Sequence, residues 1–152
     1  MFILDERLQN DTILIGRLPL SQVLLMNDKR YPWVILVPAR NDIFEYYHLS
    51  ENDRTQLMKE SNLVVEKMAD HFSASSMNVA ALGNVVPQLH QHHICRYTDD
   101  PAWPGPVWGH SPATVYDPEE LEVRVKELQS LLQQHFVADL EAVDDVENNV
   151  YW

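Results

Sequence analysis

Cysteine and long apolar runs are scarce in this chain. Cys95 is the one cysteine among 152 residues, which excludes an internal disulfide and fits a reducing compartment. No apolar run approaches the roughly 20 residues of a membrane-spanning helix. The apolar start, Met1–Leu4, meets Asp5 and Glu6 too early to form the core of a signal peptide. We therefore expect a cytoplasmic protein that does not bind membranes.

Positive charge is also scarce. Only 11 lysines and arginines stand against 23 aspartates and glutamates, which gives a formal net charge of −12. A surface this acidic repels the phosphate backbone of nucleic acids, so a nucleic-acid partner is not expected. A small anionic substrate is compatible with this charge if its pocket supplies hydrogen-bond donors. The apolar content of 45% and the chain length predict one folded domain over residues 1–152.

The middle of the chain combines strand and helix patterns. Five apolar or β-branched runs bounded by turn residues are expected to be strands: 12–16, 21–26, 33–37, 77–82 and 89–96. The short polar turns between the first three favour an antiparallel meander. A helix is expected between the third and fourth strands, because Ser50 and Asp53 have the spacing of a capping box and an apolar stripe follows to about residue 72. These patterns predict three strands, a helix and two further strands as the core of the chain.

The two ends of the chain lie outside this core. Leu8–Asp11 is expected to be a polar turn. Residues 99–112 hold four prolines and two tryptophans. This composition indicates an ordered loop whose tryptophans anchor it to the domain or to a dimer mate rather than stack on a nucleobase. Asp117 followed by proline is a strong helix start, so a C-terminal helix is expected over about 118–137, with an acidic tail after it.

Three of the seven histidines fall within four positions of the fifth expected strand. Because side chains alternate along a strand, Gln88, His90 and His92 share one face, and the residues between them share the other. Imidazole titrates near neutral pH and acts as a nucleophile, proton carrier or metal ligand. A metal site needs a third ligand, and the nearby His93 and Cys95 fall on the opposite face. We therefore expect no bound metal.

The stretch around these histidines resembles the signature of the histidine-triad (HIT) superfamily, His-φ-His-φ-His-φ-φ, in which φ is apolar. Here the sequence reads Gln88-Leu-His90-Gln-His92-His-Ile, and it is preceded by Asn78 and by Gly83-Asn84. The expected order of three strands, a helix and two strands is similar to a HIT domain over roughly residues 12–97. The resemblance implies an α+β fold with an antiparallel sheet of about five strands and a helix between the third and fourth. The proline-rich loop and the C-terminal helix resemble extensions of the bacterial HIT-hydrolase branch.

The resemblance implies an activity and a catalytic pair. HIT proteins are typically homodimers that hydrolyse or transfer nucleotidyl groups, and their substrates include dinucleoside polyphosphates and nucleoside phosphoramidates. His90 matches the histidine that attacks the α-phosphorus and forms a covalent nucleotidyl-histidine. His92 matches the histidine that contacts the phosphoryl oxygens. We therefore expect a nucleotide as substrate, a second copy of the chain as partner, and no cofactor.

Further side chains are candidates for substrate binding: Asn27, Asn78, Asn84, Gln88 and Arg96. The resemblance implies phosphate contacts for Asn78 and Asn84 and a ribose contact for Asn27. Gln88 stands in place of the first motif histidine, and its carboxamide still forms hydrogen bonds. Arg96, at the end of the strand, is either a ligand of a terminal phosphate or a solvated arginine.

Gln91 and His93 stand where HIT proteins usually have apolar residues. Together with Gln88, they leave a second interpretation open, a nucleotide-binding module without turnover. A third interpretation is a metal-dependent enzyme in which His90 and His92 bind the metal with a more distant ligand.

Overall fold

The computed structural model describes residues 1–138 and shows the α+β fold that the sequence predicts. One sheet of five antiparallel strands has the order β1-β2-β3-β5-β4. The strands are β1 (Thr12–Arg17), β2 (Ser21–Met26), β3 (Trp33–Pro38), β4 (Ser76–Ala80) and β5 (Gln91–Arg96). The predicted acidic tail, from Asp139 onward, lies outside the described residues.

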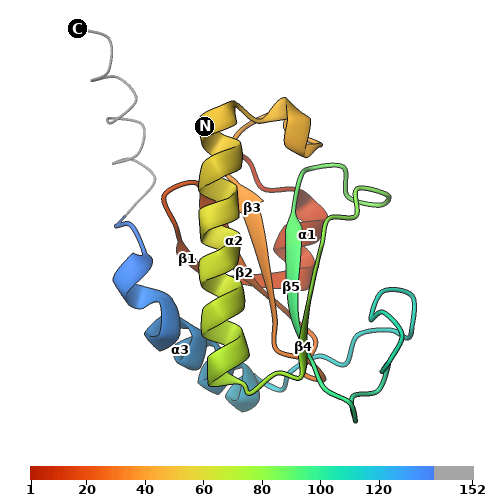
Figure 1. The fold of residues 1–152 in the computed structure, drawn as a ribbon. Coiled ribbons are helices and arrows are strands. Elements are labelled where there is room, and N and C mark those ends of the chain that lie inside the picture. Colours follow the sequence, from red (N-terminus) through yellow and green to blue (C-terminus); the bar gives the residue numbers. More distant parts are fainter. Residues whose placement is uncertain (139–152) are drawn as a thin grey trace, which may run out of the picture.

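Helices cover both faces of this sheet. They are α1 (Glu6–Asp11), α2 (Glu51–His71) and α3 (Pro118–Leu132), with single 3-10 turns η1 (Tyr46–His48) and η2 (Gln133–His135). As predicted, α2 connects β3 to β4, and it lies across one face while α1 lies on the other (Figure 1). Within residues 1–138, no helix is both long enough and apolar enough to cross a membrane.

The two long helices begin where the sequence predicts. The Oγ of Ser50 accepts a hydrogen bond from the backbone N–H of Asp53 at 3.1 Å. The Asp53 carboxylate, however, pairs with Arg40 at 2.9 Å. At the start of α3, the carboxylate of Asp117 accepts from the backbone N–H of Glu120 at 2.9 Å. Each cap satisfies a backbone donor that the first turn of a helix leaves without a partner.

The predicted polar turn over Leu8–Asp11 is wrong, because these residues belong to α1. The carboxylate of Asp5 caps it by accepting from the backbone N–H of Arg7 at 2.8 Å, and Leu8 is buried beneath it. A helix this short carries one buried side chain, which is too little for a periodic signal. Its position depends on contacts with distant parts of the chain, described below.

The sheet separates two apolar cores. The core beneath α2 and α3 contains Val23, Leu25, Val34, Leu36, Val64, Met68 and Leu128, among others. The core on the other face contains Leu8, Leu24, Trp33, Ile35, Val86, Ile94, Ala102 and Val107. The last two come from the proline-rich loop over residues 99–112, so this loop packs as an ordered layer on the same face as α1. Because both faces are covered, β3 is buried along its whole length.

Candidate active site

Side-chain alternation along β5 separates its polar residues into two sets. His92 and Arg96 lie on the α1 face, and His93 and Cys95 lie on the face covered by α2. β5 begins later than predicted, so His90 lies just before the strand. Its ring nevertheless lies beside that of His92, with 5.0 Å between the centroids. The structure therefore brings the two predicted catalytic histidines together.

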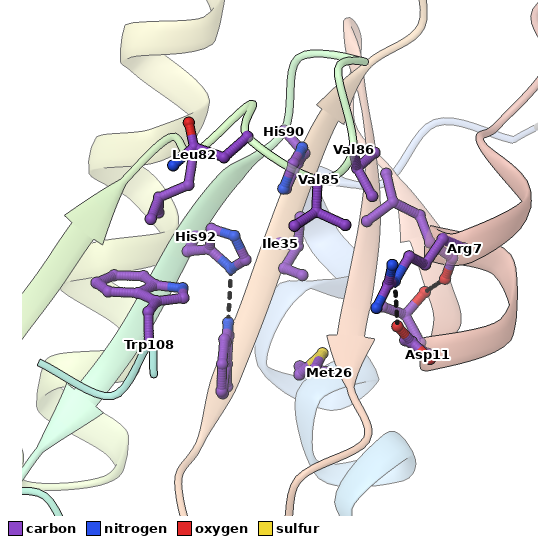
Figure 2. A pocket seen from close by; sticks show the side chains of 14 residues that line it. Arg7, Asp11, Met26, Ile35, Leu82, Val85, Val86, His90, His92 and Trp108 are labelled. Carbon is purple, nitrogen blue, oxygen red and sulfur yellow. Dashed lines mark hydrogen bonds and ion pairs between the residues drawn. The ribbon is translucent and has the colours of Figure 1, made fainter. Parts of the chain in front are cut away.

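The histidine pair borders a cavity of ≈ 340 Å³ (Figure 2). Its apolar walls come from α1, β2, β3, the β4–β5 connection and the proline-rich loop: Leu8, Met26, Trp33, Ile35, Leu82, Val85, Val86 and Trp108. On the α1 side, Arg7 and Asp11 form an exposed ion pair at 3.9 Å. Largely apolar cavities with a few convergent polar groups are typical small-molecule sites.

The backbone holds His90 in one tautomer. Its Nδ1 lies 2.7 Å from the carbonyl oxygen of Gln88. Because a carbonyl only accepts hydrogen bonds, Nδ1 carries the proton and Nε2 keeps its lone pair. His90 is only 6% exposed, so its ring at the cavity wall is largely shielded from water. A neutral imidazole in this state is a nucleophile.

The neighbouring ring is held in the opposite tautomer. The indole Nε1–H of Trp33 donates to Nδ1 of His92 at 2.9 Å, as the dashed line in Figure 2 shows. Nδ1 therefore holds the lone pair, and Nε2 carries the proton. Burial, followed by the proximity of His90 and His93, lowers the pKa of His92 to about 3. His92 is therefore neutral at physiological pH and offers an N–H donor.

Two tryptophans enclose the ring of His92. Its centroid lies 5.6 Å from that of Trp33 and 5.3 Å from that of Trp108, and the two indoles meet edge to face at 6.3 Å. Trp108 thus both anchors the proline-rich loop and forms the cavity wall. Trp103 lies apart from that wall, beside the guanidinium of Arg96. Sequence reasoning missed Trp33, because nothing in its apolar strand marks it as a partner of a histidine.

Comparisons with known proteins identify the family. A family model described as "HIT domain" matches residues 7–99, which is more than half of the chain. The chain belongs to the HIT family. A comparison with curated proteins gave no match.

Three solved histidine triad proteins from bacteria are similar to this HIT chain over most of its length. The protein from Marinobacter aquaeolei VT8 is 51% identical, with 89% of this chain and 98% of that chain covered and a TM-score of 0.86. The protein from Sinorhizobium meliloti 1021 is 48% identical, with coverages of 84% and 96% and a TM-score of 0.80. The protein from Bradyrhizobium japonicum is 43% identical, with coverages of 90% and 98% and a TM-score of 0.82.

Gln88, which replaces the first histidine of the HIT signature, joins distant parts of the chain. Its Oε1 accepts from the backbone N–H of Asp5 at 2.8 Å, and its Nε2 donates to the carbonyl of Ile3 at 2.9 Å. Its own carbonyl accepts from His90. Gln88 therefore holds the segment that precedes α1, and with it the cavity wall formed by Leu8. A substrate contact for the Gln88 carboxamide stays a prediction.

A second cavity of ≈ 240 Å³ meets the first at His90. Polar side chains in its wall are those of Glu45, Asn84 and Gln88. Asn84 lines both cavities, so it is the predicted phosphate ligand that the structure places beside His90. Its contact with a phosphate stays a prediction.

Asn78 and Arg96 lie together, but they bind each other and the proline-rich loop. Arg96 is 1% exposed, and its Nε lies 2.7 Å from Oδ2 of Asp100. It also donates to Oδ1 of Asn78 at 2.7 Å and to the carbonyl of Gly105 at 2.8 Å. Burial is the largest single influence on Asp100 and raises its pKa, but the hydrogen bonds and charge of Arg96 together with the backbone N–H groups of Tyr97 and Ala102 outweigh it and lower the pKa to about 2. Arg96 is thus not a solvated residue, and a phosphate contact would require it to leave these partners.

Asn27, the predicted ribose ligand, is engaged at the end of β2. Its Oδ1 accepts from the backbone N–H of Tyr116 at 3.0 Å. It follows Met26, which lines the larger cavity, but it is not itself among the described wall residues. A ribose contact for Asn27 stays a prediction.

The polar residues at usually apolar HIT positions bind α2. His93 is fully buried; its Nδ1–H donates to the carbonyl of Val34 at 3.3 Å, and its Nε2 accepts from the hydroxyl of Ser61 at 2.8 Å. Gln91 donates to the same hydroxyl oxygen at 3.2 Å. Burial lowers the pKa of His93 to about 4. Neither side chain is left without a hydrogen-bond partner, so neither requires a ligand on this face.

The described residues also bear on the metal interpretation. Within residues 1–138, no group of three or more histidine, cysteine, aspartate or glutamate side chains is placed to hold a metal ion. The buried thiol of Cys95 lies on the opposite face from the histidine pair, and burial raises its pKa to about 12. A thiol in this state is a poor metal ligand, because thiolate is the binding form.

Proposed function

We propose that this HIT protein is a nucleotidyl hydrolase or transferase that acts through a covalent intermediate on His90. The observation that carries the proposal is the ring of His90 at the cavity wall, whose Nδ1–H is fixed on the Gln88 carbonyl, so that Nε2 carries the lone pair. Dinucleoside polyphosphates and nucleoside phosphoramidates are the proposed substrates. A homodimer of single-domain chains is the proposed assembly.

The reaction has two displacements at phosphorus. The Nε2 lone pair of His90 attacks the α-phosphorus, a P–N bond forms, and the P–O or P–N bond to the leaving group breaks with its electron pair. The Nδ1–H stays on the Gln88 carbonyl, where it stabilises the positive charge of the N-phosphorylated ring. Water then attacks phosphorus, the bond to His90 breaks, and the proton of the water passes to solvent.

His92 contributes a hydrogen bond to this reaction. Its Nε2–H is placed to donate to a phosphoryl oxygen as negative charge develops there. Since Nδ1 already accepts from Trp33, release of the Nε2 proton would create an imidazolate. The proposed role is therefore that of an electrostatic donor, and the proton for the leaving group comes from solvent.

The larger cavity is the proposed nucleoside site. Its volume of ≈ 340 Å³ and the indole of Trp108 in its wall suit a flat heterocycle. Asn84 lies where this cavity meets the smaller one, at the place where the phosphate has to sit if His90 attacks it.

The test compares wild type with His90→Ala on a dinucleoside polyphosphate and on adenosine phosphoramidate. Loss of the nucleophile is expected to lower kcat/KM by at least about a thousand-fold. His110→Ala is the matched control, since His110 is exposed and lies outside both cavities. Equal turnover by wild type and His90→Ala would refute the proposal.

The covalent intermediate has its own readout. Wild-type protein mixed with excess substrate and denatured at alkaline pH, where phosphohistidine survives, is expected to gain the mass of one nucleoside monophosphate. His90→Ala is expected to show no adduct. Tight nucleotide binding without adduct or turnover across the substrate panel would favour the binding-module interpretation. Stoichiometric metal in tag-free active protein would favour the metal-dependent one.

A further inference from the structure

We propose that Trp33 is a positioning residue for the histidine pair: its indole N–H fixes the proton of His92 on Nε2, the nitrogen that faces the substrate. The catalytic part of this inference rests on the proposed function. The hydrogen bond itself is a separate structural claim that is tested without turnover.

The direction of the hydrogen bond follows from chemistry. An indole nitrogen only donates, whereas an imidazole nitrogen donates or accepts according to tautomer. The Trp33 Nε1 to His92 Nδ1 distance is 2.9 Å. Both residues are buried, with exposed fractions of 5% and 7%, so water does not compete for the contact. Nδ1 must therefore hold the lone pair, which leaves the proton on Nε2.

The sheet register places the two side chains together. Trp33 pairs with Ile94, and Ile35 pairs with His92, in the antiparallel β3–β5 ladder. Trp33 and His92 are therefore diagonal neighbours on one face, within reach of a large side chain. The contact needs only the first residue of β3 and one residue of β5, both in regular structure.

Packing holds the indole of Trp33 in this orientation. Tyr31 and Trp108 both contact it edge to face, with ring centroids at 6.4 Å and 6.3 Å. The guanidinium of Arg96 lies 5.9 Å from the Tyr31 ring and ties that ring to the ion pair with Asp100. The donor is thus fixed before a substrate arrives, which is the condition for electrostatic preorganisation.

The groups around His92 oppose its cationic form. A second proton on Nδ1 would face the indole N–H, and two donors would point at each other. The titratable neighbours are His90 beside it and His93 on the opposite face. Among the described wall residues of the cavity, the charged groups are Arg7 and Asp11 of α1, which pair with each other. No unpaired carboxylate of that wall stabilises an imidazolium.

The choice of tautomer matters for the reaction. With the proton on Nε2, His92 donates to the anionic phosphoryl oxygen. With the proton on Nδ1, the Nε2 lone pair would face that oxygen and repel it. Loss of the Trp33 donor therefore leaves the ring, its packing and its neutral charge in place while it weakens transition-state stabilisation.

The decisive experiment replaces only the donor. Trp33 is exchanged site-specifically for β-(3-benzothienyl)alanine, which has a sulfur atom in place of the indole N–H. Long-range ¹H–¹⁵N NMR of the His92 ring then reports which nitrogen is protonated. Wild type is expected to show the Nε2–H form down to about pH 4. The variant is expected to populate the Nδ1–H form and to titrate at least about one pH unit higher.

The same exchange at Trp108 is the matched control. The Trp108 indole also packs on His92, but its Nε1 has no hydrogen-bond partner within residues 1–138. The His92 tautomer is therefore expected to stay as in wild type. Trp33→Phe, which also lacks the donor, serves as a second variant and is expected to change the tautomer in the same way.

The catalytic part is read from kinetics. The benzothienyl variant at position 33 is expected to lose about ten-fold in kcat with little change in KM, and the acidic limb of its pH–rate profile should lie at least about one pH unit higher than that of wild type. An unchanged His92 tautomer in both donor-free variants overturns the structural claim. A changed tautomer with unchanged kcat overturns the catalytic claim and leaves His90 as nucleophile. If wild type turns over no substrate, the catalytic claim falls with the proposed function, and NMR still decides the hydrogen bond.

Discussion

Two consecutive histidines of β5 are neutral for the same reason on opposite faces of the sheet. Burial is the main cause in both, and it lowers the pKa to about 3 for His92 and about 4 for His93. The unfolded chain binds these protons near pH 6.5. The unfolded state therefore takes up more protons as the pH falls below 6.5. The contribution of these two histidines to the free energy of unfolding is therefore fully present above pH 6.5. It is lost as the pH falls from there toward pH 4 for His93 and toward pH 3 for His92.

The pH dependence can be tested at His93. Its shift corresponds to roughly 3 kcal/mol of stability lost between pH 6.5 and pH 4. His93→Gln retains a polar contact for Ser61 but removes the titration. We expect the free energy of unfolding, measured by urea denaturation, to fall less steeply below pH 6.5 in the variant than in wild type. Identical slopes in the two proteins would show that His93 is not a source of this pH dependence.

At the level of elements, local patterns predict most of the fold. The apolar runs and the caps at Ser50 and Asp117 are local signals, and the sheet and both long helices follow from them. The position of α1 and the role of Gln88 could not be predicted in this way. The hydrogen bonds from Gln88 to the segment before α1 join residues 83 and 85 positions apart. The histidine pair was predictable from its spacing in the sequence, but Trp33 lies 59 positions from His92. A sequence pattern does not specify such distant partners.

The attachment of the proline-rich loop to β5 provides a test of stability. Arg96→Met leaves the carboxylate of Asp100 buried and unpaired. We expect the free energy of unfolding to fall by about 3–5 kcal/mol. Lys126→Met is the matched control, because its ion pair with Glu122 is exposed and should contribute far less.

This variant also separates two roles for Arg96. If Arg96 is structural, chemical denaturation will show the loss without any substrate present. A normal unfolding transition combined with a raised KM would instead support the phosphate contact that the sequence suggested.

The molecule as a whole repels anions. It carries a formal net charge of −12, and the wall of the larger cavity offsets none of it, since Arg7 pairs with Asp11. A polyanionic substrate therefore approaches against an unfavourable field. Recognition of the proposed nucleotide substrate therefore depends on short-range N–H donors and on apolar contact with its nucleoside.

Salt should consequently favour the reaction. The Debye length falls from roughly 30 Å at about 0.01 M to roughly 10 Å at about 0.1 M ionic strength. Over this range we expect kcat/KM for a dinucleoside polyphosphate to rise through a lower KM. Adenosine phosphoramidate carries less charge and should show a smaller rise. A decrease for the polyphosphate would indicate an attractive cationic surface instead.

The side chain of Gln88 binds the backbone of Ile3 and Asp5, and its main-chain carbonyl binds the ring of His90, the proposed nucleophile. A displacement of residues 3–5 is therefore expected to shift the ring of His90, which lies two residues along the chain from Gln88. A purification tag fused before Met1 is therefore expected to alter the position of the His90 ring. Kinetic work on it should keep the amino-terminal end free of foreign sequence.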